Sequence, residues 1–179
     1  METTKLNLGC GADVRYGYAN LDAAAGPGVD IVHDLRIRPW PLPSGHFTEV
    51  RCVDLLEHLP DTIPSIEEIW RICAPDAQVD IRVPYWNSRY AWKDPQHMRP
   101  FQENLFDFFD PSKPECQKRP YYSTARFTIE YVVFEGTWLR LSKPWTWKVP
   151  LNENRKLLNI ITKFSDVVHF LNFRLRALK

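Results

Sequence analysis

The turn Gly9-Cys10-Gly11, directly after the apolar run Lys5–Leu8, constrains the fold of this chain more than any other feature. Two glycines at the end of a strand let the backbone approach a ligand closely and expose its N–H groups. A dinucleotide fingerprint would need a third glycine where this chain has Val14, and the Gly-Lys pair of a phosphate loop does not occur. The turn therefore predicts a ligand site, and it disfavours NAD, FAD and a phosphate loop.

Short apolar runs alternate with turns and one helix over the first 85 residues. The expected strands are 5–8, 19–22, 29–32, 49–53 and 79–83. Pro64 is expected to open a helix before the last of them, with an inward stripe of Ile66, Ile69, Trp70 and Cys73. Strands that alternate with connecting segments favour an α/β fold with a mostly parallel sheet.

The C-terminal part of the chain has a different pattern. Residues 127–134 and 137–141 flank Glu135-Gly136 and predict an antiparallel hairpin. A short helix is expected at 102–109, and residues 110–125 are expected to be the least ordered connection. Apolar residues from 152 to 179 recur at helical spacing. The chain is thus expected to hold a domain at 1–150 and an amphipathic helix at 151–179, packed on the domain, a second subunit or a membrane surface.

Acidic residues follow the second and third expected strands. Asp22 ends the second, where a carboxylate can accept hydrogen bonds from both hydroxyls of a ribose. Asp34 follows the third, where it can accept a hydrogen bond from an adenine amino group while Leu35 covers the ring. The two carboxylates together predict an adenosine site.

Five segments in this order resemble the class I S-adenosylmethionine-dependent methyltransferases, and within them the methyltransferase type 11 group. The segments are Leu6–Gly11, Gly17–Asp22, Val29–Leu35, Leu55–Leu59 and Glu68–Pro84, within roughly the first 100 residues. The resemblance implies a Rossmann-like fold that binds S-adenosylmethionine and releases S-adenosylhomocysteine. It places Leu8, Gly9, Cys10 and Gly11 along the methionine part of the cofactor, Asp22 at the ribose, Asp34 and Leu35 at adenine, and Val53 and Asp54 beside the methyl donor.

The chain departs from the pattern of that group in three places. Only ten residues separate Gly11 from Asp22, so the helix that usually follows the glycine turn is expected to be shortened or replaced by a loop. Asp76-Ala77 replaces the Gly-Gly turn of the group, and Thr48 replaces its Asp. These two changes affect turn geometry more than ligand contact.

Candidate catalytic residues lie in two segments. His97 is the first choice for a general base or for orienting the acceptor, and His58 is the second. Each histidine has a purely structural alternative role. Glu57 and His58 can stabilise the start of a helix, and Asp94 with His97 can cap the following helix. Tyr85, Trp86, Trp92 and Asp94 are expected to bind the acceptor, although aromatic side chains at such positions are often core residues.

Composition limits the ligands and the classes of function that remain possible. Twenty-three Lys and Arg balance twenty-two Asp and Glu, so no strong field attracts nucleic acid. The four cysteines are scattered without metal-ligand spacing, so no metal is expected. The predicted function is methyl transfer to a small-molecule acceptor in the cytoplasm, with a homo-oligomer or peripheral membrane contact through the terminal helix. The alternative is a catalytically silent methyltransferase-like module that acts as a partner-binding or membrane-attached subunit.

Overall fold

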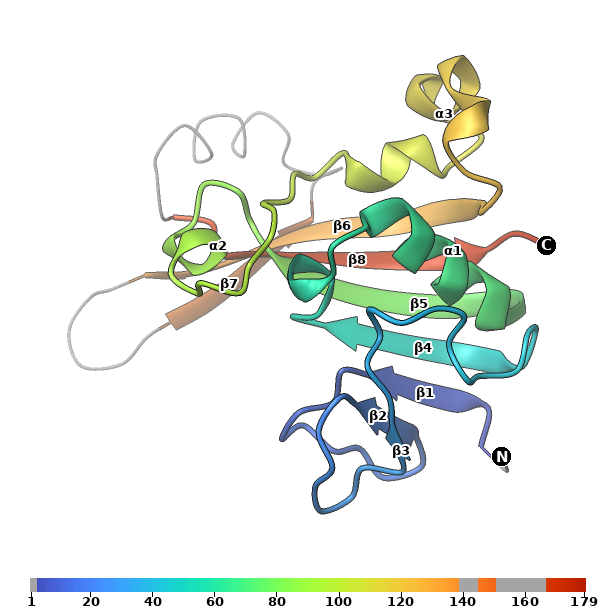
Figure 1. Cartoon of the computed structure of the whole chain (residues 1–179). Coiled ribbons are helices and arrows are strands. Elements are labelled where there is room, and N and C mark those ends of the chain that lie inside the picture. Colours follow the sequence, from blue (N-terminus) through green and yellow to red (C-terminus); the bar gives the residue numbers. More distant parts are fainter. Residues whose placement is uncertain (1–2, 139–144, 151–166) are drawn as a thin grey trace.

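The structure, a computed structural model, describes residues 3–138, 145–150 and 167–179 of the chain. Its described strands form one sheet of eight strands in the order β3-β2-β1-β4-β5-β8-β6-β7 (Figure 1). The strands are β1 (Lys5–Leu8), β2 (Ala19–Asp22), β3 (Ile31–Val32), β4 (Phe47–Val53), β5 (Cys73–Pro84), β6 (Phe127–Trp138), β7 (Trp145–Pro150) and β8 (Phe170–Ala177). The expected α/β architecture is confirmed.

The first five strands form the parallel half of the sheet. β2 and β4 flank β1, β3 pairs with β2, and β5 pairs with β4, all in parallel. Helix α1 (Thr62–Ile72) connects β4 to β5 and begins two residues before Pro64. It ends at Ile72, and β5 begins immediately at Cys73, several residues before the expected start at 79. Every strand expected in this half is present.

The last three strands form the antiparallel half. The predicted antiparallel hairpin is confirmed, since β6 pairs with β7, but its turn does not lie at Glu135-Gly136. β6 runs without a turn through both residues, and Gly136 pairs with Trp147 of β7. Buried Val132 and Phe134 alternate with the half-buried Val133 and Glu135, so the strand pattern continues to the glycine. The connection between β6 and β7 lies at 139–144, outside the described residues.

The predicted terminal helix is wrong over β8. Leu171, Phe173, Leu175 and Ala177 are fully buried, and the residues between them are not. This period of two is a strand pattern, and β8 pairs antiparallel with both β5 and β6. Apolar residues at 171 and 175 share one face in a helix and in a strand alike. This segment forms a strand because it pairs with two neighbouring strands. Residues 151–166 lie outside the described residues, so a helix there and its contacts stay a prediction, as does the domain boundary.

Residues 110–125, expected to be the least ordered connection, instead form α3 (Pro114–Lys118) and η3 (Pro120–Tyr122). Asp110 fixes their start, because its carboxylate accepts hydrogen bonds from the Ser112 and Ile129 N–H groups at 2.9 and 3.0 Å. The remaining short elements are η1 (Leu56–His58), α2 (Arg89–Trp92) and η2 (Leu105–Phe108). Among the described residues, no helix has the length and apolar content that crossing a bilayer requires.

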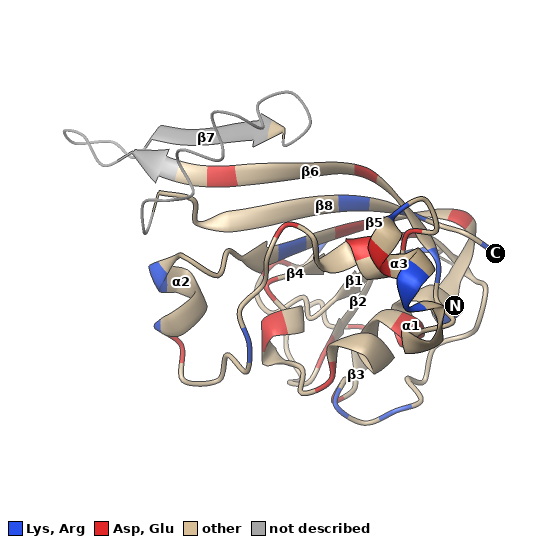
Figure 2. Cartoon of the chain, turned by 90° about the horizontal axis from the view of Figure 1, so that it is seen from above, with Lys and Arg blue, Asp and Glu red and all other residues tan. Residues whose placement is uncertain are grey.

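The two faces of the sheet differ in chemistry. α1 and α2 lie on the same side of it (Figure 2), and the buried face carries the core, including Leu6, Val50 and Phe173. On the other face one row crosses five strands, from Asn7 through Arg51, Asp80 and Arg174 to Tyr131. Cross-strand neighbours of opposite charge stabilise each other, and Arg174 bonds Asp80 at 2.7 Å. Polar pairing thus occupies a face that parallel sheets usually bury.

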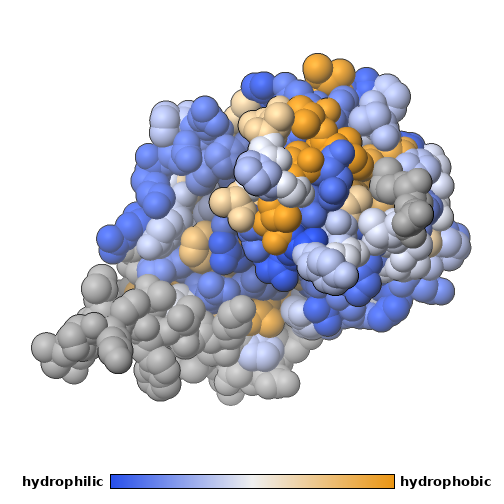
Figure 3. Space-filling model, turned by 90° about the horizontal axis from the view of Figure 1, so that it is seen from below, coloured by the Kyte–Doolittle hydropathy of each residue, from blue (hydrophilic) through white to orange (hydrophobic). Residues whose placement is uncertain are grey.

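The edge of the sheet at β3 exposes some apolar surface. Seen from below, the molecule gathers its hydrophobic surface in one area surrounded by hydrophilic residues (Figure 3). Val14, Val32 and Ile37, on β3 and the loops beside it, are among the exposed large hydrophobic residues. The carboxyl end of β2 lies beside this edge strand, and β1 follows on the other side of β2.

Candidate cofactor site

The glycine turn after β1 has the geometry that its sequence predicts. Gly9 and Gly11 have φ angles of +62° and +48°, in the left-handed region that favours glycine. A Cβ on Gly9 would lie 2.9 Å from a methyl group of Leu55, so a side chain at this position would require the Leu55 side chain to move. Residues 9–18 form turns instead of a helix. The expectation that a loop replaces the usual helix is confirmed.

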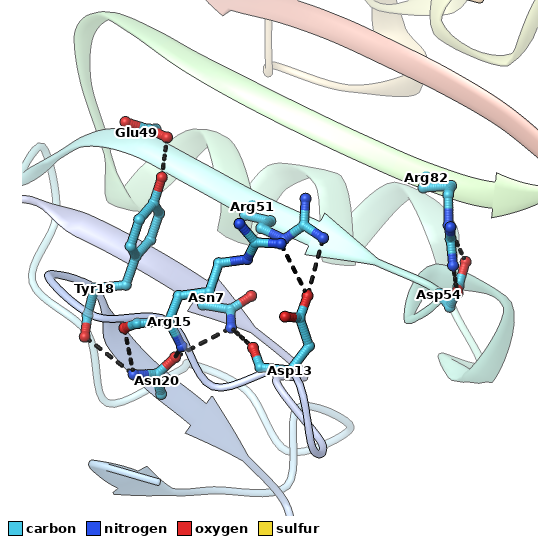
Figure 4. Close-up of polar contacts among 9 residues, drawn as sticks. All are labelled: Asn7, Asp13, Arg15, Tyr18, Asn20, Glu49, Arg51, Asp54 and Arg82. Carbon is cyan, nitrogen blue, oxygen red and sulfur yellow. Dashed lines mark hydrogen bonds and ion pairs between the residues drawn. The ribbon is translucent and has the colours of Figure 1, made fainter. Parts of the chain in front are cut away.

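A network of polar side chains holds this loop against the sheet (Figure 4). The Asn7 amide donates to the backbone oxygen of Asp13 at 2.8 Å and to the side chain of Asn20 at 3.1 Å. Asn20 accepts from the Arg15 N–H at 2.8 Å, and Asp13 pairs with Arg15 and Arg51 at 3.2 and 3.0 Å. These contacts take the place of helix packing, so the glycine turn is positioned without a helix behind it.

Asp22 lies at the end of β2 beside the glycine turn. Its Oδ2 accepts the Gly11 N–H at 2.8 Å, and its Oδ1 accepts the Ala24 N–H at 3.0 Å. Two backbone donors therefore fix the carboxylate, and each oxygen keeps a further lone pair. This is an oriented acceptor for two hydroxyl groups of a ligand.

Asp34 follows β3 and is engaged by a neighbour that sequence reasoning missed. The Arg36 guanidinium donates to both of its oxygens, with distances of 2.9 Å to Oδ1 and 2.7 Å to Oδ2. The hydrogen bonds from Arg36 lower the pKa of Asp34 to about 2. Leu35 is buried in the core, with only 5% of its surface exposed. Asp34 is therefore a charged acceptor whose lone pairs are largely used by Arg36.

Asp54 follows β4 in a strained conformation, and sequence reasoning missed its partner as well. Its φ of +51° is unusual for a residue with a side chain. Arg82 of β5 holds the carboxylate in a two-pronged ion pair, with Nε at 2.9 Å from Oδ1 (Figure 4). The Arg82 guanidinium also lies 3.9 Å from the Glu135 carboxylate. Arg82 was visible in the sequence only as an alternating polar residue of β5. The ion pair fixes a strained residue beside the cavity.

A cavity of about 650 Å³ brings most of these residues together. Its walls include Gly9, Gly11, Asp22, Asp34, Leu35, Asp54 and His58, all of them predicted from the sequence, together with Arg36, Leu55 and Gln96. Cys10 and Val53 line instead a neighbouring cavity of about 370 Å³ that shares Gly9 and Asp54. Leu8 is fully buried in the core. The cavity lies at the carboxyl ends of the parallel strands, where open α/β sheets bind ligands.

The two predicted catalytic histidines meet at one end of this cavity. The His58 and His97 rings lie with centroids 4.7 Å apart and planes at 75°. The Met98 N–H donates to the Glu57 carbonyl at 2.8 Å and joins their two segments. His58 lines the cavity, and its pKa is lowered by burial and by His97. Glu57, in the middle of η1, has only 1% of its surface exposed, and burial raises its pKa to about 8.

The predicted acceptor-binding residues lie outside the 650 Å³ cavity. Tyr85 belongs to the core, with 3% of its surface exposed and an edge-to-face contact with Phe134. Trp86 and Trp92 are exposed, and the Trp92 indole donates to the Trp86 carbonyl at 2.9 Å. Asp94 accepts the Gln96 N–H at 2.8 Å, which shapes the segment that carries His97. Their role in acceptor binding stays a prediction.

The order of strands, the glycine turn and the position of the cavity define the class I S-adenosylmethionine-dependent methyltransferase fold. Solved structures with this fold include a methyltransferase from Thermotoga maritima described as a possible histamine N-methyltransferase (12% identity, 98% of this chain and 82% of that chain, TM-score 0.56). The YcgJ protein of Bacillus subtilis shares 11% identity over 99% of this chain and 94% of that chain, with a TM-score of 0.57.

A third similar structure is a putative methyltransferase of Haloferax volcanii in complex with the Trm112 methyltransferase activator, at 13% identity, 100% of this chain, 86% of that chain and a TM-score of 0.56. At such identities the likeness establishes the fold alone. No family model matches the chain, and no curated relative matches it.

Proposed function

We propose that this protein transfers the methyl group of S-adenosylmethionine to a small-molecule acceptor. The observation that carries the proposal is the 650 Å³ cavity in which Gly9, Gly11 and the anchored carboxylate of Asp22 meet. These residues were predicted from two separate segments of the sequence as parts of one site. A cavity of this size lies within the range of about 300–1,000 Å³ found for small-molecule and cofactor sites.

The residues in the cavity fit an adenosine-containing cofactor. Asp22 would accept hydrogen bonds from the ribose hydroxyls, since both of its oxygens keep a lone pair that the backbone donors do not use. Leu35 would cover adenine, and the flat Arg36 guanidinium on Asp34 offers a second surface for the ring. The glycine turn would approach the methionine part, because neither glycine carries a side chain that blocks it.

When bound, the sulfonium of S-adenosylmethionine supplies an activated methyl group, so the main task of the chain is alignment. Holding an acceptor in line with the methyl group can supply about 7–11 kcal/mol of effective concentration. His58 borders the cavity, where it can contact an acceptor, and its ring contacts that of His97. We propose a proton-accepting or orienting role for this pair, as the sequence predicted.

The test is a methyl-transfer assay with a panel of phenols, carboxylic acids and amines, in which S-adenosylhomocysteine is quantified by mass spectrometry. We expect acceptor-dependent product with the wild-type protein and with Asp61→Ala, an exposed control whose carboxylate pairs only with Arg38 among the contacts described. Asp22→Ala should lower product formation at least tenfold at limiting cofactor. Cofactor binding without turnover on any acceptor class would favour the silent-module alternative instead.

A further inference from the structure

Three potential metal ligands converge at the end of the cavity. One oxygen of Glu57 and one ring nitrogen each of His58 and His97 lie within 4.8 Å of one another. Glu57 and His58 come from η1, and His97 comes from a loop 39 residues further along the chain. The Met98 N–H bond to the Glu57 carbonyl, at 2.8 Å, fixes the two segments together. Sequence spacing could not reveal this cluster, because its third member is brought in by the fold.

The Glu57 carboxyl is the strongest sign of a ligand. The residue has 1% of its surface exposed, and among the described residues neither of its carboxylate oxygens has a hydrogen-bond partner. Buried polar groups almost always have a partner, and leaving one unpaired costs about 1–3 kcal/mol. A bound cation between Glu57 and the two imidazoles would supply that partner.

The imidazole ring of His97 is held as metal-binding histidines usually are. The Nδ1 of His97 lies 3.3 Å from the Ala91 carbonyl, which accepts a hydrogen bond when that nitrogen carries the proton. A backbone partner on one nitrogen fixes the tautomer and leaves the other nitrogen as a ligand.

We propose that Glu57, His58 and His97 bind a divalent transition-metal ion, with Zn²⁺ as the preferred ion. Imidazole and carboxylate ligands suit Zn²⁺, and three protein ligands leave a coordination position open for water or an oxygen of a substrate. Ligand atoms around tetrahedral zinc lie about 3.3 Å apart for bonds of about 2.0–2.1 Å. The cluster, with spacings of up to 4.8 Å, therefore contracts by rotation of the side chains when the ion binds.

This site goes beyond the proposed function, because it does not depend on S-adenosylmethionine. His58 connects it to the cavity wall, so an ion there would bind an acceptor oxygen close to the methyl donor. A metal-bound nitrogen cannot also accept a proton. With the ion bound, only the orienting role proposed above for His58 and His97 applies, and the proton-accepting role does not.

The test uses untagged full-length protein and Co²⁺ as a spectroscopic probe, followed by displacement with Zn²⁺. We expect one equivalent of Co²⁺ with visible absorption of a four- or five-coordinate ion, and at least tenfold weaker binding in Glu57→Gln, His58→Asn and His97→Asn. His46→Asn is the matched control, because His46 contacts the Thr3 carbonyl at 3.1 Å and lies outside the cluster. It should bind Co²⁺ as the wild type does.

Two results would overturn the proposal. One is wild-type protein that takes up neither Co²⁺ nor Zn²⁺ at micromolar concentration, and the other is equal binding by the wild type and all three ligand variants. Circular dichroism and thermal unfolding identify a variant that fails to fold. If Glu57→Gln does not fold, the Co²⁺ affinity of His97→Asn decides whether the site exists, because His97 is only half-buried. Cofactor binding, measured separately on the same proteins, keeps failure of this site distinct from failure of the proposed function.

Discussion

The parallel and antiparallel halves of the sheet differ in how their sequence relates to their structure. In the parallel half, β1 to β4 coincide with local apolar runs that have a glycine or an acidic residue at or just after their ends, and the candidate site lies at those ends. In the antiparallel half, β8 comes from the far end of the chain and inserts between β5 and β6. The first half is specified by local patterns, and the second by pairing between segments far apart in sequence.

The two halves also differ in what they contribute. The walls of the 650 Å³ cavity come from residues 9–98, on the parallel half and the loops that follow it. β8 contributes four fully buried side chains to the core. We therefore expect substitutions in the antiparallel half to change stability alone, and those at the glycine turn to change both the site and, by a smaller amount, stability.

The largest effect on stability is expected from Phe173→Ala in β8. Phe173 has 1% of its surface exposed and contacts Phe106 at a centroid distance of 4.9 Å. Replacing a buried phenylalanine by alanine destabilises a protein by about 3–5 kcal/mol, because apolar burial is lost and a cavity is left. Urea unfolding followed by circular dichroism should show this loss, with the affinity of the folded fraction for S-adenosylmethionine unchanged.

Arg176→Ala, at an exposed position of the same strand, is the control for that experiment. Its ion pair with Glu130 is at the surface, so the change in stability should stay within about 1 kcal/mol. If Phe173→Ala cost no more than Arg176→Ala, β8 could not be a central strand, and the division into two halves would be wrong.

An intermediate loss of stability is expected at the glycine turn, where Gly9→Ala and Gly11→Ala form a matched pair. Both residues have positive φ, which costs a residue with a side chain about 1–2 kcal/mol. The new methyl group at position 9 would also meet Leu55 at 2.9 Å, whereas at position 11 it would meet no atom within 4 Å. Gly9→Ala should therefore lower the free energy of unfolding more than Gly11→Ala in the same urea titration, and equal losses would refute the close contact with Leu55.

The smallest effect concerns the pH dependence of Asp34. Hydrogen bonds from Arg36 lower its pKa from 3.8 to about 2, so the pair contributes stability above the ordinary pKa and loses it as the pH falls toward 2. In Arg36→Ala the pKa of Asp34 should return toward 3.8. Carboxyl ¹³C NMR titration of both proteins measures the midpoint, and an unchanged midpoint would show that Arg36 does not hold this carboxylate.

Sequence alone predicted the parallel half and much of the cofactor cavity, because glycine turns and strand-end acids are local signals. It could not find Arg36 or Arg82 as partners of Asp34 and Asp54, since an arginine two residues away or on the next strand has no distinctive local pattern. It misassigned β8 because Leu171 and Leu175 fit both periodicities. It placed His58 and His97 separately, and only the packing of the 94–98 segment on η1 brings them together.

Calorimetric titration with S-adenosylmethionine and S-adenosylhomocysteine tests the central claim most directly. The wild-type protein and Asp61→Ala should bind one equivalent of each ligand, and Asp22→Ala should bind at least tenfold more weakly, because hydrogen bonds to a charged group contribute about 1.5–3 kcal/mol. Asp22→Asn should also weaken binding while retaining an oxygen that accepts the Gly11 N–H. Wild-type protein that shows no binding at millimolar ligand, or Asp22→Ala that binds as tightly as the wild type, would contradict the account.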